Sequence, residues 1–142
     1  MHKKTGSTEG HALAATSPLQ AARVADAPRR LDLCRCAVLD RNFDALSLVV
    51  ELDSDMMHAV MMTSSPSLYY WQPASLAVMQ VVRAWRGEGI PACYTVDAGA
   101  NVHVLCPEKE AAEVSGRLRT VAGVTNVLTA SVGGPAKVVE ER

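Results

Sequence analysis

The pattern of apolar and polar positions along the chain is helical over its first half, and the earliest long helix is expected at residues 18–40. Ser17 is a suitable N-cap, and proline is favoured at the first helical position that follows it. Pro28 lies inside this span, where a proline lacks the backbone donor and clashes with the preceding turn. We therefore expect a kink at Pro28, or a break into two helices.

A second helix is predicted to begin at Asn42 or Asp44. Its apolar residues recur at the spacing of one helix face and are expected to meet a core: Phe43, Leu46, Val50, Met57 and Val60. Asp53 falls on the same face, so it is predicted to be a buried carboxylate that needs a hydrogen-bond donor.

Residues 63–73 are rich in turn-forming types and are predicted to form a loop with an aromatic anchor at residues 69–71. The clearest helix follows at residues 73–87, with proline at its start and Gly89 beyond its end. Its apolar face is expected to pack on a sheet through four side chains: Leu76, Met79, Val82 and Trp85.

Two short runs rich in β-formers, IPACYTV and NVHVLC, surround the segment 97–100, which contains Gly99. This spacing predicts an antiparallel hairpin with a tight turn. A fourth helix is expected from Pro107 to Gly123, followed by a strand at residues 124–132. The order of elements indicates an α+β fold in which helices cover one face of a mainly antiparallel sheet.

Composition and charge indicate one domain and argue against nucleic-acid and membrane partners. A length of 142 residues suits one domain. The 14 basic and 15 acidic residues are spread along the chain, which argues against a nucleic-acid partner. No apolar run approaches the length of a membrane span, and no apolar signal segment follows the first lysines. We therefore expect a soluble, cytoplasmic protein with no membrane partner.

The cysteines give no indication of a metal site. They fall at Cys34, Cys36, Cys93 and Cys106, without paired zinc spacing or suitably placed histidines. We interpret all four as small buried apolar residues in a reducing compartment.

Two polar or glycine-rich stretches are the candidates for function, and the first is KKTGSTEGH at residues 3–11. It is predicted to be a loop ahead of a helical run. Its hydroxyls and backbone amides could bind a phosphate, as helix N-termini do, although it lacks a phosphate-loop motif. An ordinary chain terminus with an N-cap serine has the same composition, so both interpretations stay open.

The second candidate is DAGAN at residues 97–101. An aspartate that opens a hairpin turn usually bonds through its side chain to the backbone two residues on. A carboxylate held by a rigid hairpin could instead orient or deprotonate a hydroxyl in a cleft. The hairpin sequence leaves both roles of Asp97 open. His58, one turn after Ser54, and Asp53 are interpreted as hydrogen-bonded packing residues rather than as catalysts.

Taken in order from Lys3 to about Cys106, these stretches resemble the carboxyl-terminal domain of the mevalonate diphosphate decarboxylases, which belong to the GHMP kinase superfamily. That domain begins with a lysine pair and a Ser-Ser-Thr-x-Gly-Met-like stretch, which KKTGSTEGH resembles. Further matches are a Thr-Ser pair, an R...PRR-like helix, MHA, a P-x-x-Y-W loop, a G-I-P strand and a D-A-G-P-N-like hairpin. The resemblance implies a ferredoxin-like GHMP kinase C-terminal domain over residues 1–142.

The resemblance also implies an activity. Enzymes of this family use ATP and magnesium to phosphorylate the tertiary 3-hydroxyl of mevalonate 5-diphosphate, and loss of phosphate and carbon dioxide then gives isopentenyl diphosphate for isoprenoid biosynthesis. By resemblance, Asp97 lies beside that hydroxyl as base or positioning group, Ser7 contacts the substrate, and Thr8 approaches the diphosphate end. The complete enzyme is expected to be a homodimer.

Several departures from the family pattern keep other functions open. The family's amino-terminal half, which binds most of ATP and magnesium, is not in this sequence, so the chain alone is expected to be inactive. Gly6, His11 and Ala100 stand where the family has serine, methionine and proline, and loss of the proline should loosen the turn that holds Asp97. The alternatives are a mevalonate 5-phosphate decarboxylase and a non-catalytic α+β binding or dimerisation module.

Overall fold

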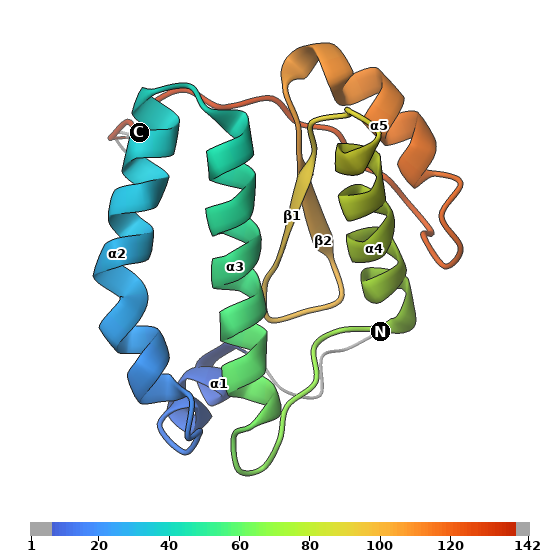
Figure 1. Cartoon of the computed structure of the whole chain (residues 1–142). Coiled ribbons are helices and arrows are strands. Elements are labelled where there is room, and N and C mark those ends of the chain that lie inside the picture. The colour runs from blue at the N-terminus through green and yellow to red at the C-terminus, as the bar shows by residue number, and fades with distance from the viewer. Residues whose placement is uncertain (1–6, 139–142) are drawn as a thin grey trace.

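A computed structural model of the chain describes residues 7–138, which contain α-helices and one two-stranded sheet (Figure 1). In chain order the elements are α1 (Ser7–Ala14), α2 (Gln20–Leu39), α3 (Phe43–Met62), α4 (Pro73–Gly87), β1 (Cys93–Val96), β2 (Val102–Leu105), the 3-10 helix η1 (Glu108–Glu110) and α5 (Ala111–Leu118). α2 lies beside α3, and α3 and α4 both pack against β1. The predicted α+β fold is confirmed.

The two strands form the predicted antiparallel hairpin. Cys93 lies opposite Leu105, and the last pair is Val96 opposite Val102. Residues 97–101 therefore form the turn, which projects from the end of the sheet near the last turns of α3 (Figure 1).

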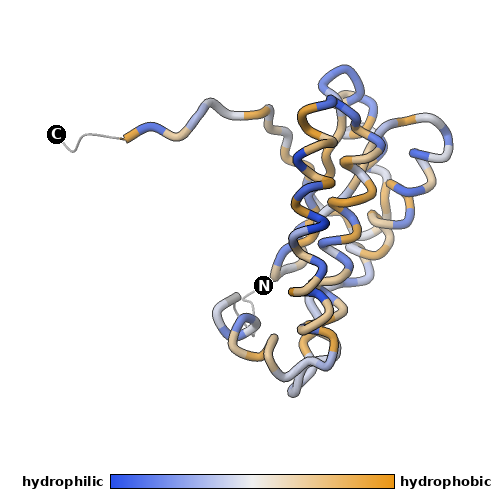
Figure 2. Tube along the Cα trace, turned by 60° about the vertical axis from the view of Figure 1, so that its left-hand side comes forward, coloured by the Kyte–Doolittle hydropathy of each residue, from blue (hydrophilic) through white to orange (hydrophobic). Residues whose placement is uncertain are grey.

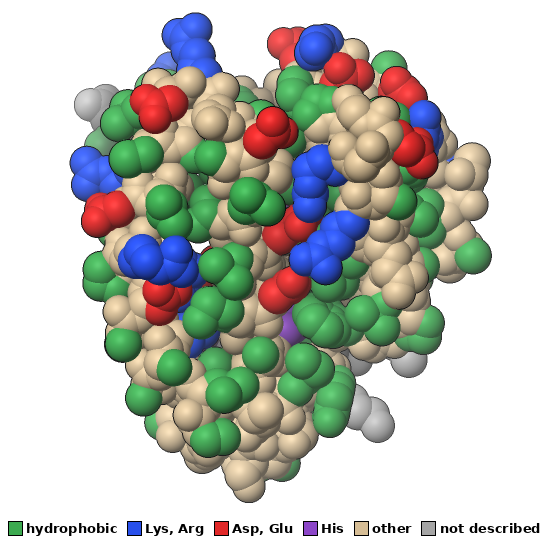
Figure 3. All heavy atoms as spheres, viewed as in Figure 1, with side chains coloured by type: hydrophobic (Ala, Val, Ile, Leu, Met, Phe, Trp, Pro, Cys, Tyr) green, Lys and Arg blue, Asp and Glu red, His purple; other side chains and the backbone are tan. Residues whose placement is uncertain are grey.

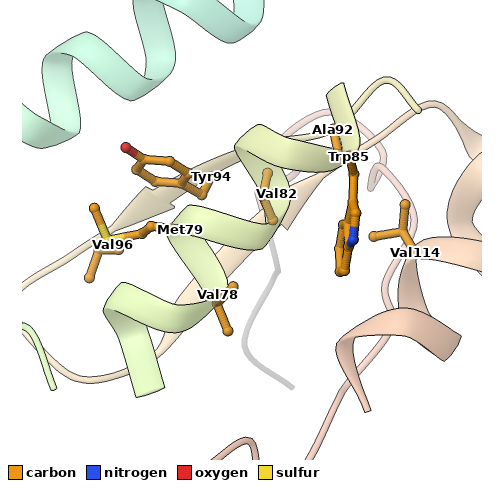
Figure 4. Close-up of a cluster of buried hydrophobic side chains, with 8 residues drawn as sticks. All are labelled: Val78, Met79, Val82, Trp85, Ala92, Tyr94, Val96 and Val114. Atoms are coloured by element: carbon orange, nitrogen blue, oxygen red, sulfur yellow. The ribbon is translucent and has the colours of Figure 1, made fainter. Parts of the chain in front are cut away.

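The apolar core lies between α4, the hairpin and α5 (Figure 4). Its buried side chains are Val78, Met79, Val82, Trp85, Ala92, Tyr94, Val96 and Val114. Trp85 stands next to Val114 of α5, while Met79 lies toward Tyr94 and Val96 of β1 (Figure 4). The buried face of α4 thus packs against both a strand and a second helix.

The prediction for α4 is confirmed for Met79, Val82 and Trp85 and wrong for Leu76. The Leu76 side chain is 42% exposed, whereas Val78 is buried. Because α4 packs on α5 as well as on β1, its buried face is turned toward Val78 and away from Leu76. The bounds of the helix agree with the prediction, since Pro73 is its first residue.

α2 runs unbroken through Pro28, so the predicted break into two helices is wrong. The Pro28 ring is exposed, and the buried Arg30 two residues later bridges this region. Its Nε donates to Asp53 of α3 at 3.0 Å, and its Nη2 donates to the Arg23 carbonyl at 3.2 Å. These two bonds, one to α3 and one within α2, help to offset the loss of a helical hydrogen bond at proline.

The start of α2 also differs from the prediction. The helix begins at Gln20, and Ser17 is not its N-cap. Ser17 is buried, and its Oγ lies 2.6 Å from Thr63 Oγ1 at the end of α3. The neighbouring Thr16 Oγ1 accepts from the Ser65 N–H at 2.8 Å. The Thr-Ser pair therefore anchors the α1–α2 connection to the end of α3.

α3 begins as predicted, with Asn42 as its N-cap: Asn42 Oδ1 accepts from the Ala45 N–H at 3.0 Å. The side chains expected to face a core are all buried or half-buried. Buried polar residues also line this helix, namely Ser47, Glu51, Ser54 and His58. α3 lies between α2 and β1, so more than one face of it is covered.

The predicted buried carboxylate is wrong, because the Asp53 side chain is 52% exposed and pairs with Arg23 and Arg30 of α2. The buried acid is Glu51, whose side chain is 3% exposed. Arg86 of α4 donates to both Glu51 carboxylate oxygens at 2.8 Å. Figure 3 shows basic and acidic side chains gathered along the line between α3 and α4.

Residues 124–132, predicted as a strand, form none. In the described part of the chain the sheet has two strands, and neither pairs with this segment. A β-rich sequence becomes a strand only where a partner supplies its backbone hydrogen bonds. Figure 2 shows the chain after α5 running away from the helices toward the C-terminus. α5 is also shorter than predicted, ending at Leu118, and Gly123 has a φ of 85° in the turn that follows.

Candidate active site

An open cleft of about 510 Å³ lies where α1, the start of α2, the last turns of α3 and the hairpin turn meet. α1 contributes Gly10 and His11, α2 contributes Arg23, α3 contributes Met57, and the turn contributes Asp97. The end of the first stretch that the sequence singled out, Gly10 and His11, is therefore brought to one cleft with the start of the second, Asp97 and Ala98.

The Asp97 carboxylate is open to solvent at the edge of this cleft, with its side chain 85% exposed. The expected side-chain bond to the backbone is not formed. The turn instead contains a backbone bond, in which the Gly99 N–H donates to the Asp97 carbonyl at 2.7 Å. His103 Nε2 lies 3.8 Å from Asp97 Oδ2. The carboxylate is therefore available to a ligand while the turn is closed by other atoms.

α1 reaches the cleft through a close contact at Gly10. A methyl group at this position would lie 2.7 Å from Tyr70 Oη and 3.3 Å from Met61 Sδ, so only glycine allows this approach. Burial raises the pKa of Tyr70, with a further contribution from Glu9 of α1. The tyrosine of the predicted loop anchor thus holds α1 against α3.

The proposed substrate residues of the amino-terminal stretch lie at the start of α1. The predicted loop is helical from Ser7 onward, so this part of the prediction is wrong. Ser7 is the first residue of the helix, and its side chain lies outside the described residues, as does Gly6. Thr8 is exposed on the first turn of α1, two residues before Gly10.

Arg23 is a residue of the cleft to which the sequence pattern assigned no role. Its Nη2 donates to the two Asp53 carboxylate oxygens at 3.1 and 3.3 Å. Its Nε is buried and has no hydrogen-bond partner among the described residues. Arg23 is one of the arginines in the R...PRR-like helix, but nothing in that motif showed that the side chain would reach a cleft.

His58 and Ser54 of α3 hold the residue that precedes Asp97. His58 Nε2 lies 2.9 Å from the Val96 carbonyl oxygen, and Ser54 Oγ accepts from the Val96 N–H at 3.0 Å. The His58 ring packs edge-on against Tyr70 and tilted against Trp71, with ring centroids 6.1 and 4.9 Å away. Burial lowers the pKa of His58, so the imidazole is neutral near pH 7. Its predicted role as a hydrogen-bonded packing residue is confirmed.

Residues 1–140 match the profile of a family described as the mevalonate 5-diphosphate decarboxylase C-terminal domain. The chain belongs to this family. The resemblance found in the ordered motifs is thereby confirmed, and so is the assignment of the chain as the C-terminal domain of a mevalonate-pathway decarboxylase.

Individual family members agree with this assignment. A phosphomevalonate decarboxylase from Haloferax volcanii is 35% identical over 134 residues, which cover 94% of this chain and 41% of that protein. A solved structure concerns the mevalonate diphosphate mediated ATP binding mechanism of the mevalonate diphosphate decarboxylase from Enterococcus faecalis. It is 28% identical with a TM-score of 0.76, covering 84% of this chain and 38% of that one.

A second solved structure from the decarboxylase family is described as MDDEF in complex with MVAPP, AMPPCP and magnesium. It is 28% identical with a TM-score of 0.78, and the match covers 86% of this chain and 38% of that one. Nucleotide-analogue and magnesium complexes are therefore known within the family. The chain spans about two fifths of the length of these relatives.

Within residues 7–138, no three His, Cys, Asp or Glu side chains lie close enough together to hold a metal ion. The described residues therefore supply no complete set of protein ligands for a metal ion. Cys93 is buried and Cys34 and Cys106 are half-buried, but Cys36 is exposed, so the prediction of four buried thiols is wrong for Cys36.

No helix over residues 7–138 combines the length and apolar character of a membrane span.

Proposed function

We propose that the protein carrying this domain is an ATP-dependent decarboxylase of a phosphorylated mevalonate, and that Asp97 acts on the 3-hydroxyl of its substrate. The observation that carries the proposal is the Asp97 carboxylate, which is exposed at a cleft and accepts no hydrogen bond from the backbone of its own turn. A carboxylate that merely shaped the turn would be engaged with the backbone.

Asp97 has the chemistry that the first step requires. As the hydroxyl oxygen bonds to the terminal phosphorus of ATP, the bond from that phosphorus to the bridging oxygen breaks and ADP leaves, while the carboxylate can align the hydroxyl and accept its proton. Phosphoryl transfer depends mainly on positioning and on stabilisation of charge, so a fixed carboxylate is a sufficient contribution from this domain. Ser7 and Thr8 lie at the N-terminal end of α1. Ser7 is proposed to contact the substrate through its hydroxyl, and Thr8 to approach the phosphorylated end of the substrate.

ATP and magnesium are proposed to bind mainly outside this domain. The described residues have no cluster of metal ligands, and the sequence has no glycine-rich phosphate loop. The 142-residue chain is therefore expected to turn over neither ATP nor substrate by itself. A cytoplasmic location is proposed on the ground that all four cysteines carry free thiols, which suits a reducing compartment.

Two substrates are candidates, mevalonate 5-diphosphate and mevalonate 5-phosphate. The diphosphate agrees with the family description and with the Enterococcus faecalis relative. The monophosphate is favoured by one specific observation, the 35% identity to the Haloferax volcanii phosphomevalonate decarboxylase. Rates measured with each substrate decide between them, and turnover of neither would favour a binding or dimerisation module.

The complete protein is proposed to be a homodimer, because exposed apolar side chains gather on α2 and α3. They include Val24, Leu31, Val38 and Leu39 of α2 and Leu48 of α3. Exposed apolar area of this kind commonly marks an interface. Analytical ultracentrifugation of the complete protein tests this, and a monomer at micromolar concentration would refute it.

The role of Asp97 is tested in a complete decarboxylase that carries this domain. Asp97→Asn should lower kcat by about 100- to 10,000-fold and leave KM and the thermal melt nearly unchanged, because a transition-state interaction is lost. The turn should persist, since its bond uses the Asp97 carbonyl. Asp32→Asn on α2, also exposed, is the matched control and should have normal kinetics. An Asp97→Asn enzyme with normal turnover contradicts the proposal.

A further inference from the structure

The turn that carries Asp97 lacks a rigid sequence of its own. Residues 97–101 are DAGAN, with no proline and with a glycine at position 99. Within described residues 97–101, one backbone hydrogen bond closes the turn, from the Gly99 N–H to the Asp97 carbonyl. Such a segment has many accessible conformations, so groups outside it must fix the direction of the carboxylate.

Buried side chains from two helices supply that restraint at both ends of the turn. Before the turn, Val96 directs its N–H and its carbonyl toward α3, where Ser54 and His58 meet them. Near the other end of the turn, the buried Ser75 of α4 donates from Oγ to the Ala100 carbonyl at 3.1 Å. Both peptide groups of Val96 are thus held from one side.

The bond to His58 is the most restrictive of these contacts. A carbonyl oxygen only accepts hydrogen bonds, so His58 Nε2 must carry the proton and donate it. The ring is 1% exposed and is fixed by Tyr70 and Trp71, so it cannot follow a moving carbonyl. Its donor also points at the peptide unit that joins Val96 to Asp97, which sets the direction in which the Asp97 side chain leaves the strand.

We propose that His58 and Ser54 are positioning residues for the reaction, which hold Val96 so that the Asp97 carboxylate is aimed into the cleft. This inference rests on the proposed function of Asp97. Position 100 holds alanine, so the turn has no proline to restrict it, and the hydrogen bonds from α3 restrain it from outside. Reacting groups must be held closely in place, so a small displacement of this carboxylate is enough to slow the reaction.

His58→Phe in a complete decarboxylase tests the inference, because phenylalanine keeps the ring contacts and removes the donor. We expect kcat to fall about 10- to 100-fold with KM within about threefold of the original, measured on folded enzyme. His58→Gln places an amide donor near Nε2 and should restore kcat to within about threefold of the original. Ser54→Ala should lower kcat as well, whereas Ser47→Ala should not. Ser47 is also buried on α3, but it bonds to the Phe43 carbonyl of its own helix and to the Cys93 thiol at the other end of β1, away from Val96.

A double-mutant cycle with Asp97→Asn separates positioning from a merely structural role. If His58 acts through Asp97, then His58→Phe should change kcat by less than about twofold in the Asp97→Asn background. Two outcomes overturn this inference but leave the proposed function standing. One is a fall in kcat for His58→Phe that is as large in the Asp97→Asn background as in the original enzyme. The other is normal turnover of both His58→Phe and Ser54→Ala while Asp97→Asn is slow. Normal turnover of Asp97→Asn overturns the proposed function and this inference with it.

Discussion

β1 has two kinds of neighbour, and the contrast between them separates stability from geometry. Toward α4 and α5 it meets apolar side chains such as Trp85 and Val82. Toward α3 it meets buried polar groups, with Ser54 and His58 bonded to the backbone of Val96. Apolar burial is non-directional, whereas a hydrogen bond requires a particular distance and angle. The α4 side is therefore suited to stabilising the fold, and the α3 side to fixing where one strand ends.

The largest effect on stability is expected on the apolar side. Trp85→Ala should lower the free energy of unfolding by about 3 to 5 kcal/mol, because it leaves a cavity between α4 and α5. Urea denaturation of the 142-residue chain measures this. In a complete decarboxylase, turnover per folded molecule should stay near normal. If Trp85→Ala instead slowed folded enzyme as much as Asp97→Asn does, the proposed division between the two sides would be wrong.

A smaller effect is expected from the buried acid on the polar side. Glu51→Gln should lower the free energy of unfolding by about 2 to 3 kcal/mol, because charge-assisted bonds from Arg86 to a buried carboxylate are lost. Asp53→Asn on the same helix is the control, since its carboxylate is half exposed and screened by solvent. Chemical denaturation measures the free energy of unfolding of both variants. Equal losses would contradict the expectation that the buried carboxylate contributes more than the exposed one.

His58 should make stability depend on pH near neutrality. Burial lowers its pKa below the ordinary 6.5, so the unfolded chain binds a proton more readily than the folded one, despite the nearby carboxylates of Asp55 and Asp97. Stability is therefore complete above pH 6.5 and is lost as the pH falls below it, by at most about 1.4 kcal/mol per pH unit. Denaturation curves at pH 7 and at about 5.5 test this against His58→Gln, in which the extra slope should vanish.

The smallest effect on stability is expected at Leu76, which the apolar pattern wrongly placed on the buried face of α4. Leu76→Ala should change the free energy of unfolding by less than about 0.5 kcal/mol, because Leu76 is already 42% exposed. Met79→Ala on the same helix should cost about 2 to 5 kcal/mol, because it empties a buried position. Thermal melts of the two variants suffice, and a large loss for Leu76→Ala would show that another part of the protein covers it.

The chain itself determined the features that depend on near neighbours. Asn42 caps α3, Pro73 begins α4, and the segment around Gly99 forms the hairpin turn. Each of these is governed by backbone angles and by hydrogen bonds that reach only a few residues, so local sequence is sufficient. The ordered motifs also indicated the family and both stretches of the candidate site.

The tertiary structure decided which polar groups are buried and what they hold. Asp53 and Glu51 have the same chemistry and lie two residues apart on α3, yet only Glu51 meets an arginine of α4 in the interior. His58 bonds to β1 because the Val96 carbonyl oxygen lies 2.9 Å from its Nε2, and residues 124–132 form no strand because neither strand of the sheet pairs with them. These outcomes depend on partners distant in sequence, and the periodicity of one segment carries no information about the surface that comes to face it.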